Sequence, residues 1–209
     1  MHDYYKELAD YLKRDVRLVF ERCNYARFEL AWRWEKYKEH NFLDEFYKDT
    51  DLYLFDLTMY CDHLQKRGTF DWFRKMIKEK EIKTMVDFGG GIGEYSIIAS
   101  EMGVKCTHYD FEGQLLDYAT HRFKKRKLDI KTYDLSHDFP EADLYVCMDV
   151  FEHLKDPVPN IEKISKLCKY MVCNPTEPPY NIIYPQHLSR FILPQFELID
   201  RYLYKSNQT

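Results

Sequence analysis

Hydrophobic positions recur at intervals of three and four in the first 80 residues. The first of them are Tyr5, Leu8, Leu12, Val16, Val19, Phe20 and Cys23. This spacing places apolar side chains on one face of a helix. No glycine precedes Gly68 and no proline precedes Pro140, so the region lacks the residues that interrupt helices. We therefore predict four or five helices in residues 1–80, one of which covers 52–66 and ends at Gly68.

After Glu81 the pattern changes to short apolar runs separated by helical stretches. The expected strands are 84–88, 104–109, 130–133, 144–148, 170–173 and 196–204, and the expected helices are 95–102, 114–125 and 161–167. Strands that alternate with helices predict βαβ units, and hence an α/β fold with a parallel sheet. The chain offers six strand candidates, and only five residues follow the last of them.

Composition is that of a soluble globular protein, with 45% hydrophobic and 32% charged residues. The net charge of −4 provides no general attraction to nucleic acid or to an anionic membrane. No apolar stretch reaches the length of a transmembrane helix, and the first residues do not resemble a signal peptide. The six cysteines form no CxxC pair. We therefore expect a cytoplasmic protein with reduced, buried thiols.

A glycine-rich segment follows the first expected strand. It contains four of the seven glycines of the chain: Gly89, Gly90, Gly91 and Gly93. Glycine lets the backbone turn sharply and approach a ligand closely, and the helix that follows presents unpaired N–H groups. The dinucleotide pattern GxGxxG, started at Gly89, requires a glycine at the position of Glu94. The spacing therefore disfavours a nicotinamide dinucleotide.

Acidic residues follow the second and third expected strands. Asp110 comes directly after strand 104–109, where a carboxylate can accept hydrogen bonds from both hydroxyls of a ribose. The alternative for Asp110 is ordinary capping of the next helix. Asp134 and Leu135 follow strand 130–133, where an aspartate is also common in turns. Asp110 after a glycine loop favours a nucleoside ligand but does not choose between cofactors.

Two segments resemble the class I S-adenosylmethionine-dependent methyltransferases. The first has the pattern D-x-G-x-G-x-G over residues 87–93, and the second reads DLYVCMDVFEHLKDP over residues 143–157. The second segment is similar to small-molecule members of this superfamily, which carry E-H after the fourth strand, and distantly to ubiquinone-biosynthesis O-methyltransferases. The resemblance covers residues 85–198 and leaves the first 80 residues unmatched.

This resemblance implies a Rossmann-like methyltransferase sheet, here expected to lack the seventh strand, behind an N-terminal helical region. The helical lid or substrate region would be residues 1–80 and the S-adenosylmethionine-binding domain residues 81–209. With S-adenosylmethionine as cofactor, Asp87 would anchor its amino-acid end, Asp110 its ribose and Phe111 its adenine. The implied cofactor residues are Asp87, Gly89, Gly90, Gly91, Gly93, Asp110, Phe111, Asp134, Leu135 and Asp149.

The segment after the fourth expected strand also offers candidates for catalysis. Asp149, Glu152 and His153 have the spacing i, i+3, i+4, which places them on one face if the segment is helical. Metal-dependent relatives carry E-x-x-E-H here, and small-RNA 2′-O-methyltransferases add a later histidine, for which His187 is the candidate. Aspartate has a shorter arm than glutamate, so we expect no metal, with Mg²⁺ as the alternative. His153 and His187 are the expected catalytic bases, because imidazole titrates near neutral pH.

The expected activity is methyl transfer to an oxygen, nitrogen or carbon nucleophile of a small molecule. Aromatic residues are concentrated before residue 75, and they are expected to pack over the cofactor cleft or to line a substrate pocket. One alternative is methylation of RNA or another macromolecule, which the negative charge opposes. The other is a non-catalytic partner subunit that associates through the N-terminal helices or an open sheet edge, which a missing seventh strand would favour. A homo-oligomer through the same surfaces is also an expectation.

Overall fold

Most of the N-terminal part of the chain that the structure describes is helical. The computed structural model describes residues 4–37, 46–47, 50–174 and 193–208. Its first helices are α1 (Tyr4–Leu12), α2 (Val16–Tyr37), α4 (Leu52–Asp62) and α5 (Leu64–Glu79). These helices carry apolar residues at the helical spacing noted in the sequence, and the buried face of α2 consists of Val19, Cys23, Ala26, Leu30 and Trp34.

The boundary between α4 and α5 differs from the prediction. The backbone is extended at His63, with φ −67° and ψ 137°, so α4 ends there. Helix α5 then passes through Gly68 without a break. Gly68 is absent from the residues with positive φ, so it does not use the conformation that makes glycine a helix terminator. A glycine inside a helix costs only about 1 kcal/mol relative to alanine, and the prediction that the helix ends at Gly68 was wrong.

The described residues that follow form a seven-stranded sheet. Its strands are β1 (Thr84–Phe88), β2 (Lys105–Asp110), β3 (Lys131–Asp134), β4 (Ala142–Cys147), β5 (Cys168–Cys173), β6 (Phe196–Asp200) and β7 (Leu203–Ser206). Their order is β3-β2-β1-β4-β5-β7-β6. The first five strands are parallel, and β7 is antiparallel to both of its neighbours. The prediction of an α/β fold with a Rossmann-like, mainly parallel sheet is confirmed.

The expectation of a missing seventh strand was wrong. The run 196–204, interpreted as a single strand, turns at Arg201 and Tyr202 and pairs with itself as the hairpin β6–β7. Leu198 pairs with Tyr204, and Asp200 pairs with Leu203. The turn contains neither glycine nor asparagine, the residues that usually mark a tight hairpin in a sequence. The hairpin inserts β7 between β5 and β6, so the argument for a non-catalytic subunit from an incomplete sheet is lost.

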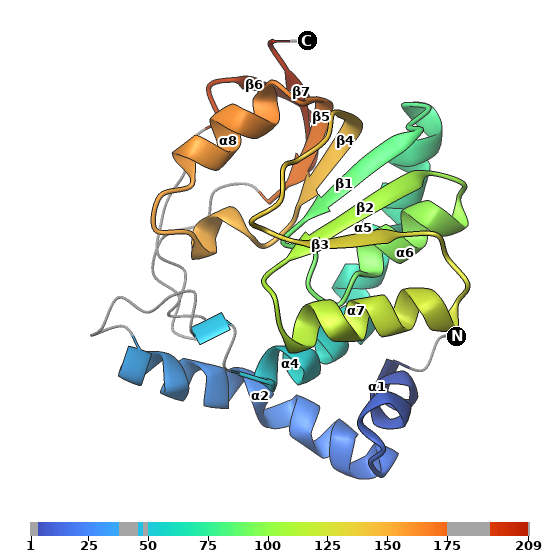
Figure 1. Ribbon diagram of the computed structural model, residues 1–209, viewed down its shortest axis with the longest axis vertical. Coiled ribbons are helices and arrows are strands. Elements are labelled where there is room, and N and C mark those ends of the chain that lie inside the picture. Colours follow the sequence, from blue (N-terminus) through green and yellow to red (C-terminus); the bar gives the residue numbers. More distant parts are fainter. Residues whose placement is uncertain (1–3, 38–45, 48–49, 175–192, 209) are drawn as a thin grey trace.

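Helices cover both faces of the sheet (Figure 1). Helix α8 (Val158–Ser165) lies on one face, and α5, α6 (Glu94–Glu101) and α7 (Gln114–Lys125) lie on the other. The two faces alternate along each strand. In β1, Met85 belongs to the core cluster that includes α5 and α6, whereas Val86 belongs to the cluster that includes α8.

The N-terminal helices and the sheet share one hydrophobic core. Leu8 of α1, Val19 of α2 and Leu54 of α4 belong to the same buried cluster as Met85 and Val146 of the sheet. Helices α2 and α4 cross the end of the molecule toward which β1 points (Figure 1). The N-terminal helices are therefore packed against the carboxyl edge of the parallel strands, where open α/β sheets bind ligands.

A buried ion-pair network joins α1 to α7 and to the start of α6. Arg122 of α7 is fully buried, and its Nε donates to Oε2 of Glu7 over 2.9 Å. Its Nη2 donates to Oε2 of Glu94 over 2.7 Å, and its Nη1 donates to the carbonyl of Ile92 over 2.6 Å. Tyr4 also donates to Glu94, over 2.8 Å. Buried charges need such pairing, so this network fixes where α1 sits against the glycine segment.

Three further features concern the surface of α2, the cysteines and the length of the helices. The outer face of α2 exposes large apolar residues at Leu18, Tyr25, Phe28 and Trp32. All six cysteines are buried and free, in agreement with the expectation of reduced thiols. Within the part of the chain that the structure describes, none of the helices has the length and apolar composition needed to cross a bilayer.

Candidate active site

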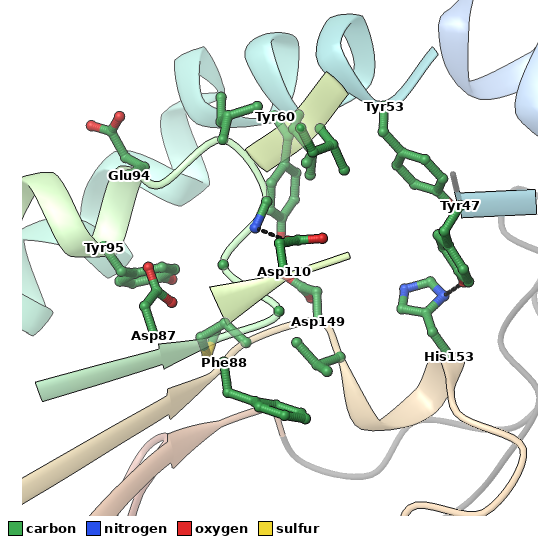
Figure 2. Close-up of a pocket in the computed structure, with 18 of the residues that line it drawn as sticks. Tyr47, Tyr53, Tyr60, Asp87, Phe88, Glu94, Tyr95, Asp110, Asp149 and His153 are labelled. Atoms are coloured by element: carbon green, nitrogen blue, oxygen red, sulfur yellow. Dashed lines mark hydrogen bonds between the residues drawn. The ribbon is translucent and has the colours of Figure 1, made fainter. Parts of the chain in front are cut away.

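A cavity of about 450 Å³ lies where the sheet meets the N-terminal helices (Figure 2). The loops after β1, β2, β3 and β4 form one wall, and α4 and α5 contribute another. Its lining includes Tyr47, Tyr53, Asp56, Leu57, Tyr60, Lys66, Asp87, Gly89, Gly90, Gly91, Glu94, Tyr95, Asp110, Phe111, Leu135, Asp149, His153 and Lys155. A concave site at the carboxyl ends of parallel strands is the usual ligand site of such a fold.

The glycine loop forms one side of this cavity with its backbone. The N–H groups of Gly89 and Gly90 donate to the carbonyl of Tyr109, over 2.9 and 3.1 Å. Gly91 has φ +56°, a conformation that other residues rarely adopt. Gly93 also has a positive φ, but it does not line the cavity. A Cβ at Gly93 would lie 2.5 Å from the Phe123 ring, so this glycine permits packing of the loop on α7.

Asp110 is at the centre of the cavity wall (Figure 2). Its Oδ2 accepts the N–H of Gly91 over 2.6 Å, and its Oδ1 accepts the N–H of Phe111 over 2.7 Å. Burial raises the pKa of this carboxyl, against the opposing effects of His108 and of the two backbone N–H groups. A carboxylate has about four acceptor positions, so Asp110 can hold the glycine loop and still accept hydroxyl groups from a ligand.

Asp87 also lines the cavity, but its side chain is directed toward the first turn of α6. Its Oδ2 accepts the backbone N–H of Ser96 over 3.1 Å and the Ser96 hydroxyl over 2.7 Å. His108 lies beside the same oxygen, with its Nδ1 at 3.5 Å. Asp87 is almost fully buried, so it stabilises the loop and helix start from beneath.

Asp149 follows β4 with φ +57°, and this left-handed residue prevents a helix from starting there. Only residues Phe151–His153 form a short 3₁₀ helix, η2. The predicted shared helical face of Asp149, Glu152 and His153 is therefore absent. Asp149 Oδ2 instead accepts the Tyr60 hydroxyl over 2.8 Å and Lys66 Nζ over 3.1 Å. Among the described residues, no three His, Cys, Asp or Glu side chains are grouped as metal ligands.

The environment of Asp149 favours its charged form. Burial acts to raise the pKa, but the charge of Lys66 and hydrogen bonds from Tyr60, Lys66 and Asn174 outweigh it and hold the pKa below its ordinary value. Asn174 is the residue directly after β5, and its Nδ2 donates to Asp149 Oδ1. Asp149 is therefore an ionised acceptor at one end of the cavity.

His153 lies on the opposite side of Asp110 from Tyr95 in the view of Figure 2. Its Nδ1 is 2.8 Å from the Tyr47 hydroxyl. The Tyr47 ring in turn stacks on Phe111, with centroids 5.9 Å apart and planes 10° from parallel. Burial raises the pKa of Tyr47 well above its ordinary value, so the tyrosine remains a neutral hydroxyl. His187, the second predicted base, lies outside the described residues.

The sequence profile of the Methyltransferase domain family matches residues 86–170, the segment that contains the glycine loop, Asp110 and Asp149. Residues 86–170 are therefore similar to a methyltransferase domain, a family whose cofactor is S-adenosylmethionine. No curated protein matches the chain in sequence.

Several solved structures share part of this fold. An S-adenosylmethionine-dependent methyltransferase from Clostridium acetobutylicum ATCC 824 is 14% identical, with a TM-score of 0.49 over 56% of this chain and 55% of that chain. TehB from Haemophilus influenzae is 18% identical, with a TM-score of 0.46 over 50% and 40%. The N-terminal domain of EvdMO1 with SAH bound is 12% identical, with a TM-score of 0.46 over 50% and 48%. This chain spans about half of the length of these structures.

Within the methyltransferase domain, the predicted cofactor residues do not all reach the cavity. Phe111 and Leu135 line it, as do the three glycines 89–91. Asp134 does not line it; its carboxylate accepts the N–H of Ser136 over 2.9 Å. Hydrogen bonds from Ser136 lower the pKa of Asp134. This is the turn chemistry typical of an aspartate after a strand.

Sequence reasoning missed several polar residues of the cavity. Asp56 lies on α4, Lys66 on α5, and Tyr95 on α6, and all three line the cavity. Burial raises the pKa of Asp56 from 3.8 to about 6, with Arg27 acting in the opposite direction. No local motif marks Asp56 or Lys66, because each belongs to a helix outside the methyltransferase domain and reaches the cavity only through packing.

Proposed function

We propose that this chain is a methyltransferase that transfers a methyl group from S-adenosylmethionine to an oxygen, nitrogen or carbon atom of a small molecule. The observation that carries the proposal is the single cavity shared by the glycine loop, the buried carboxylate of Asp110 and the aromatic residues of the N-terminal helices. When bound, the cofactor supplies a methyl group on a sulfonium, which is already reactive toward a nucleophile. The protein must then align the two reactants and exclude water.

The chemistry of the lining fits this cofactor. Asp110 presents acceptors suited to ribose hydroxyls, and Phe111 and Leu135 offer apolar contacts for adenine. The lining residues carry more acidic than basic side chains. The acidic ones are Asp56, Asp87, Glu94, Asp110 and Asp149, and the basic lysines are Lys66 and Lys155. An excess of negative charge attracts a ligand whose sulfonium and ammonium groups outnumber its carboxylate.

His153 is the residue that we propose for proton removal from the acceptor. The Tyr47 hydroxyl is within hydrogen-bond distance of Nδ1. In the tautomer with its proton on Nδ1, the histidine donates to the Tyr47 oxygen and carries its lone pair on Nε2. Tyr47 would then set the orientation of the ring. The sequence-based role of His187 stays a prediction.

The helices of residues 1–80 would form the cover of the site, and residues 81–209 its cofactor-binding base. Tyr53, Asp56 and Tyr60 of α4 face the same cavity as the glycine loop. A wall of tyrosine side chains suits an acceptor that is small and at least partly apolar. The net charge of −4 argues against a nucleic-acid acceptor.

Binding calorimetry followed by a transfer assay tests the proposal. We expect S-adenosylhomocysteine to bind and NADH not to bind. With methyl-labelled S-adenosylmethionine, label should enter at least one member of a panel of phenols, amines, carboxylic acids and carbon acids. His153→Ala should lower the rate while His121→Ala, on α7 outside the cavity lining, should not. Binding of NADH without S-adenosylhomocysteine would overturn the cofactor assignment, and transfer to RNA alone would overturn the small-molecule acceptor.

A further inference from the structure

One end of the cavity brings together a buried cation, a carboxylate and two tyrosine hydroxyls. Lys66 is almost fully buried, and its Nζ lies 3.1 Å from Asp149 Oδ2 and 2.5 Å from the Tyr60 hydroxyl. A lysine ammonium has three donors, and these two contacts account for two of them among the described residues. The other lysine of the lining, Lys155, is exposed. Lys66 is therefore a buried cation of the cavity wall.

Tyr95 supplies an unpaired group at the same end. Its side chain lines the cavity and is 8% exposed. Its hydroxyl has no hydrogen-bond partner among the described residues. The Lys66 ammonium lies 5.9 Å from the centroid of the Tyr95 ring. A buried hydroxyl without a partner is destabilising, so the Tyr95 hydroxyl favours a ligand that accepts a hydrogen bond here.

The charges at this end are complementary to an α-amino acid. Such a group carries an ammonium, which only donates, and a carboxylate, which only accepts. Asp149 is an acceptor with 31% of its side chain accessible, and it lines the cavity beside Lys66. Lys66 and Tyr95 are donors. A ligand with one negative group alone would meet the repulsion of Asp149, and a ligand with one positive group alone would meet that of Lys66.

We propose that Lys66 and Tyr95 bind the carboxylate of the amino-acid end of S-adenosylmethionine and that Asp149 binds its ammonium. This inference rests on the proposed function, since it takes the cavity to be the cofactor site. Lys66 belongs to α5, outside the segment 86–170 that matches the family. The N-terminal helices are thus part of the cofactor site as well as its cover. Asp87, whose carboxylate is engaged by Ser96, stabilises the loop beneath.

The test compares two ligands that differ only in this carboxylate. S-adenosylmethionine and decarboxylated S-adenosylmethionine are titrated by calorimetry into the full chain and its variants. The unaltered protein should bind the carboxylated ligand about 10- to 100-fold more tightly, the range expected of hydrogen bonds to a charged group. Lys66→Met should abolish this preference, and Lys66→Arg should retain part of it. Lys78→Met is the matched control, which removes an exposed lysine of the same helix α5 outside the cavity lining and should keep the preference.

Tyr95→Phe keeps the buried ring and removes only the hydroxyl. It should weaken binding of S-adenosylmethionine about 3- to 10-fold, with little effect on the decarboxylated ligand. If Lys66→Met fails to fold by circular dichroism, this variant decides the question. Equal binding of both ligands by the unaltered protein, or an equal loss for both ligands in the variants, overturns the proposed carboxylate site while leaving the cofactor assignment intact. Binding of neither ligand by the unaltered protein contradicts the proposed function itself.

Discussion

The guanidinium of Arg122 joins three segments that are distant in the sequence. It donates to Glu7 of α1, to Glu94 at the start of α6, and to the carbonyl of Ile92 in the glycine loop, over 2.6 to 2.9 Å. Arg122→Met keeps a long side chain in the same space and removes all three hydrogen bonds. The change leaves two buried carboxylates with fewer partners, and it frees the loop that forms one wall of the cavity.

The size of the effect follows from what stays buried. Breaking a buried ion pair by removing one partner costs about 3–5 kcal/mol. Glu7 keeps its hydrogen bonds from Arg126, and Glu94 keeps that from Tyr4, so we expect a value near the lower limit, about 3 kcal/mol. That is a large part of the roughly 5–15 kcal/mol of a typical domain. For a chain of this length it corresponds to a fall in Tm of about 6–12 °C.

Urea unfolding followed by circular dichroism at neutral pH measures this loss. The control is Arg74→Met, which removes an exposed pair with Asp71 and should cost less than about 1 kcal/mol. Adding Glu94→Gln to Arg122→Met should cost less than the sum of the two single changes, because the two side chains share one interaction. If Arg122→Met were no more destabilising than Arg74→Met, the network would not hold α1 in place. In Arg122→Met, the affinity for S-adenosylhomocysteine should fall together with stability. In Arg74→Met, that affinity should stay unchanged.

Four further predictions concern the cavity. Asp110→Ala should weaken S-adenosylhomocysteine binding about 10- to 100-fold in calorimetry, and unchanged affinity would contradict the ribose assignment. Gly91→Val should abolish that binding in a folded protein, because a branched residue is strained at a φ of +56° and its Cβ would lie 2.7 Å from Leu57 in the cavity wall. His153→Ala should lower turnover about 10²- to 10⁴-fold with cofactor affinity unchanged. Tyr47→Phe should lower turnover to a smaller degree. Parallel losses of stability and turnover in these variants would indicate a structural role. Burial raises the pKa of Asp56 from 3.8 to about 6, so the charged form of this side chain destabilises the fold. Stability should therefore fall by up to about 3 kcal/mol as pH rises from about 4 to 6. Asp56→Asn should remove this fall in urea unfolding and be the more stable form at pH 8.

Local patterns in the sequence determined the order of helices and strands and the position of the glycine loop. Each of these depends on a few consecutive residues, such as the period of the apolar positions or the spacing of Gly89, Gly91 and Gly93. The placement of Asp110 followed from the same logic, because the residue after a parallel strand must emerge at the carboxyl edge of the sheet. The structure brings these residues to one cavity, apart from Gly93.

Local patterns failed where two conformations suit the same residues. Gly68 is compatible with a helix end and with a helix interior. In the folded chain it lies inside α5, and the break between α4 and α5 is at His63. The run 196–204 suits one long strand or two short ones, and pairing with the edge of β5 selected the hairpin. Asp149 was expected on a helical face but has φ +57°, and its carboxylate accepts hydrogen bonds from Tyr60 and Lys66.

The polar end of the cavity was decided by tertiary structure alone. Tyr60, Lys66, Tyr95 and Asp149 come from α4, α5, α6 and the loop after β4, and no spacing within any one segment relates them. They meet because the apolar faces of the N-terminal helices are buried against the sheet, and that packing carries their polar side chains to the glycine loop. Hydrophobic burial acts between segments far apart in the chain, so its result is visible only once the chain has folded.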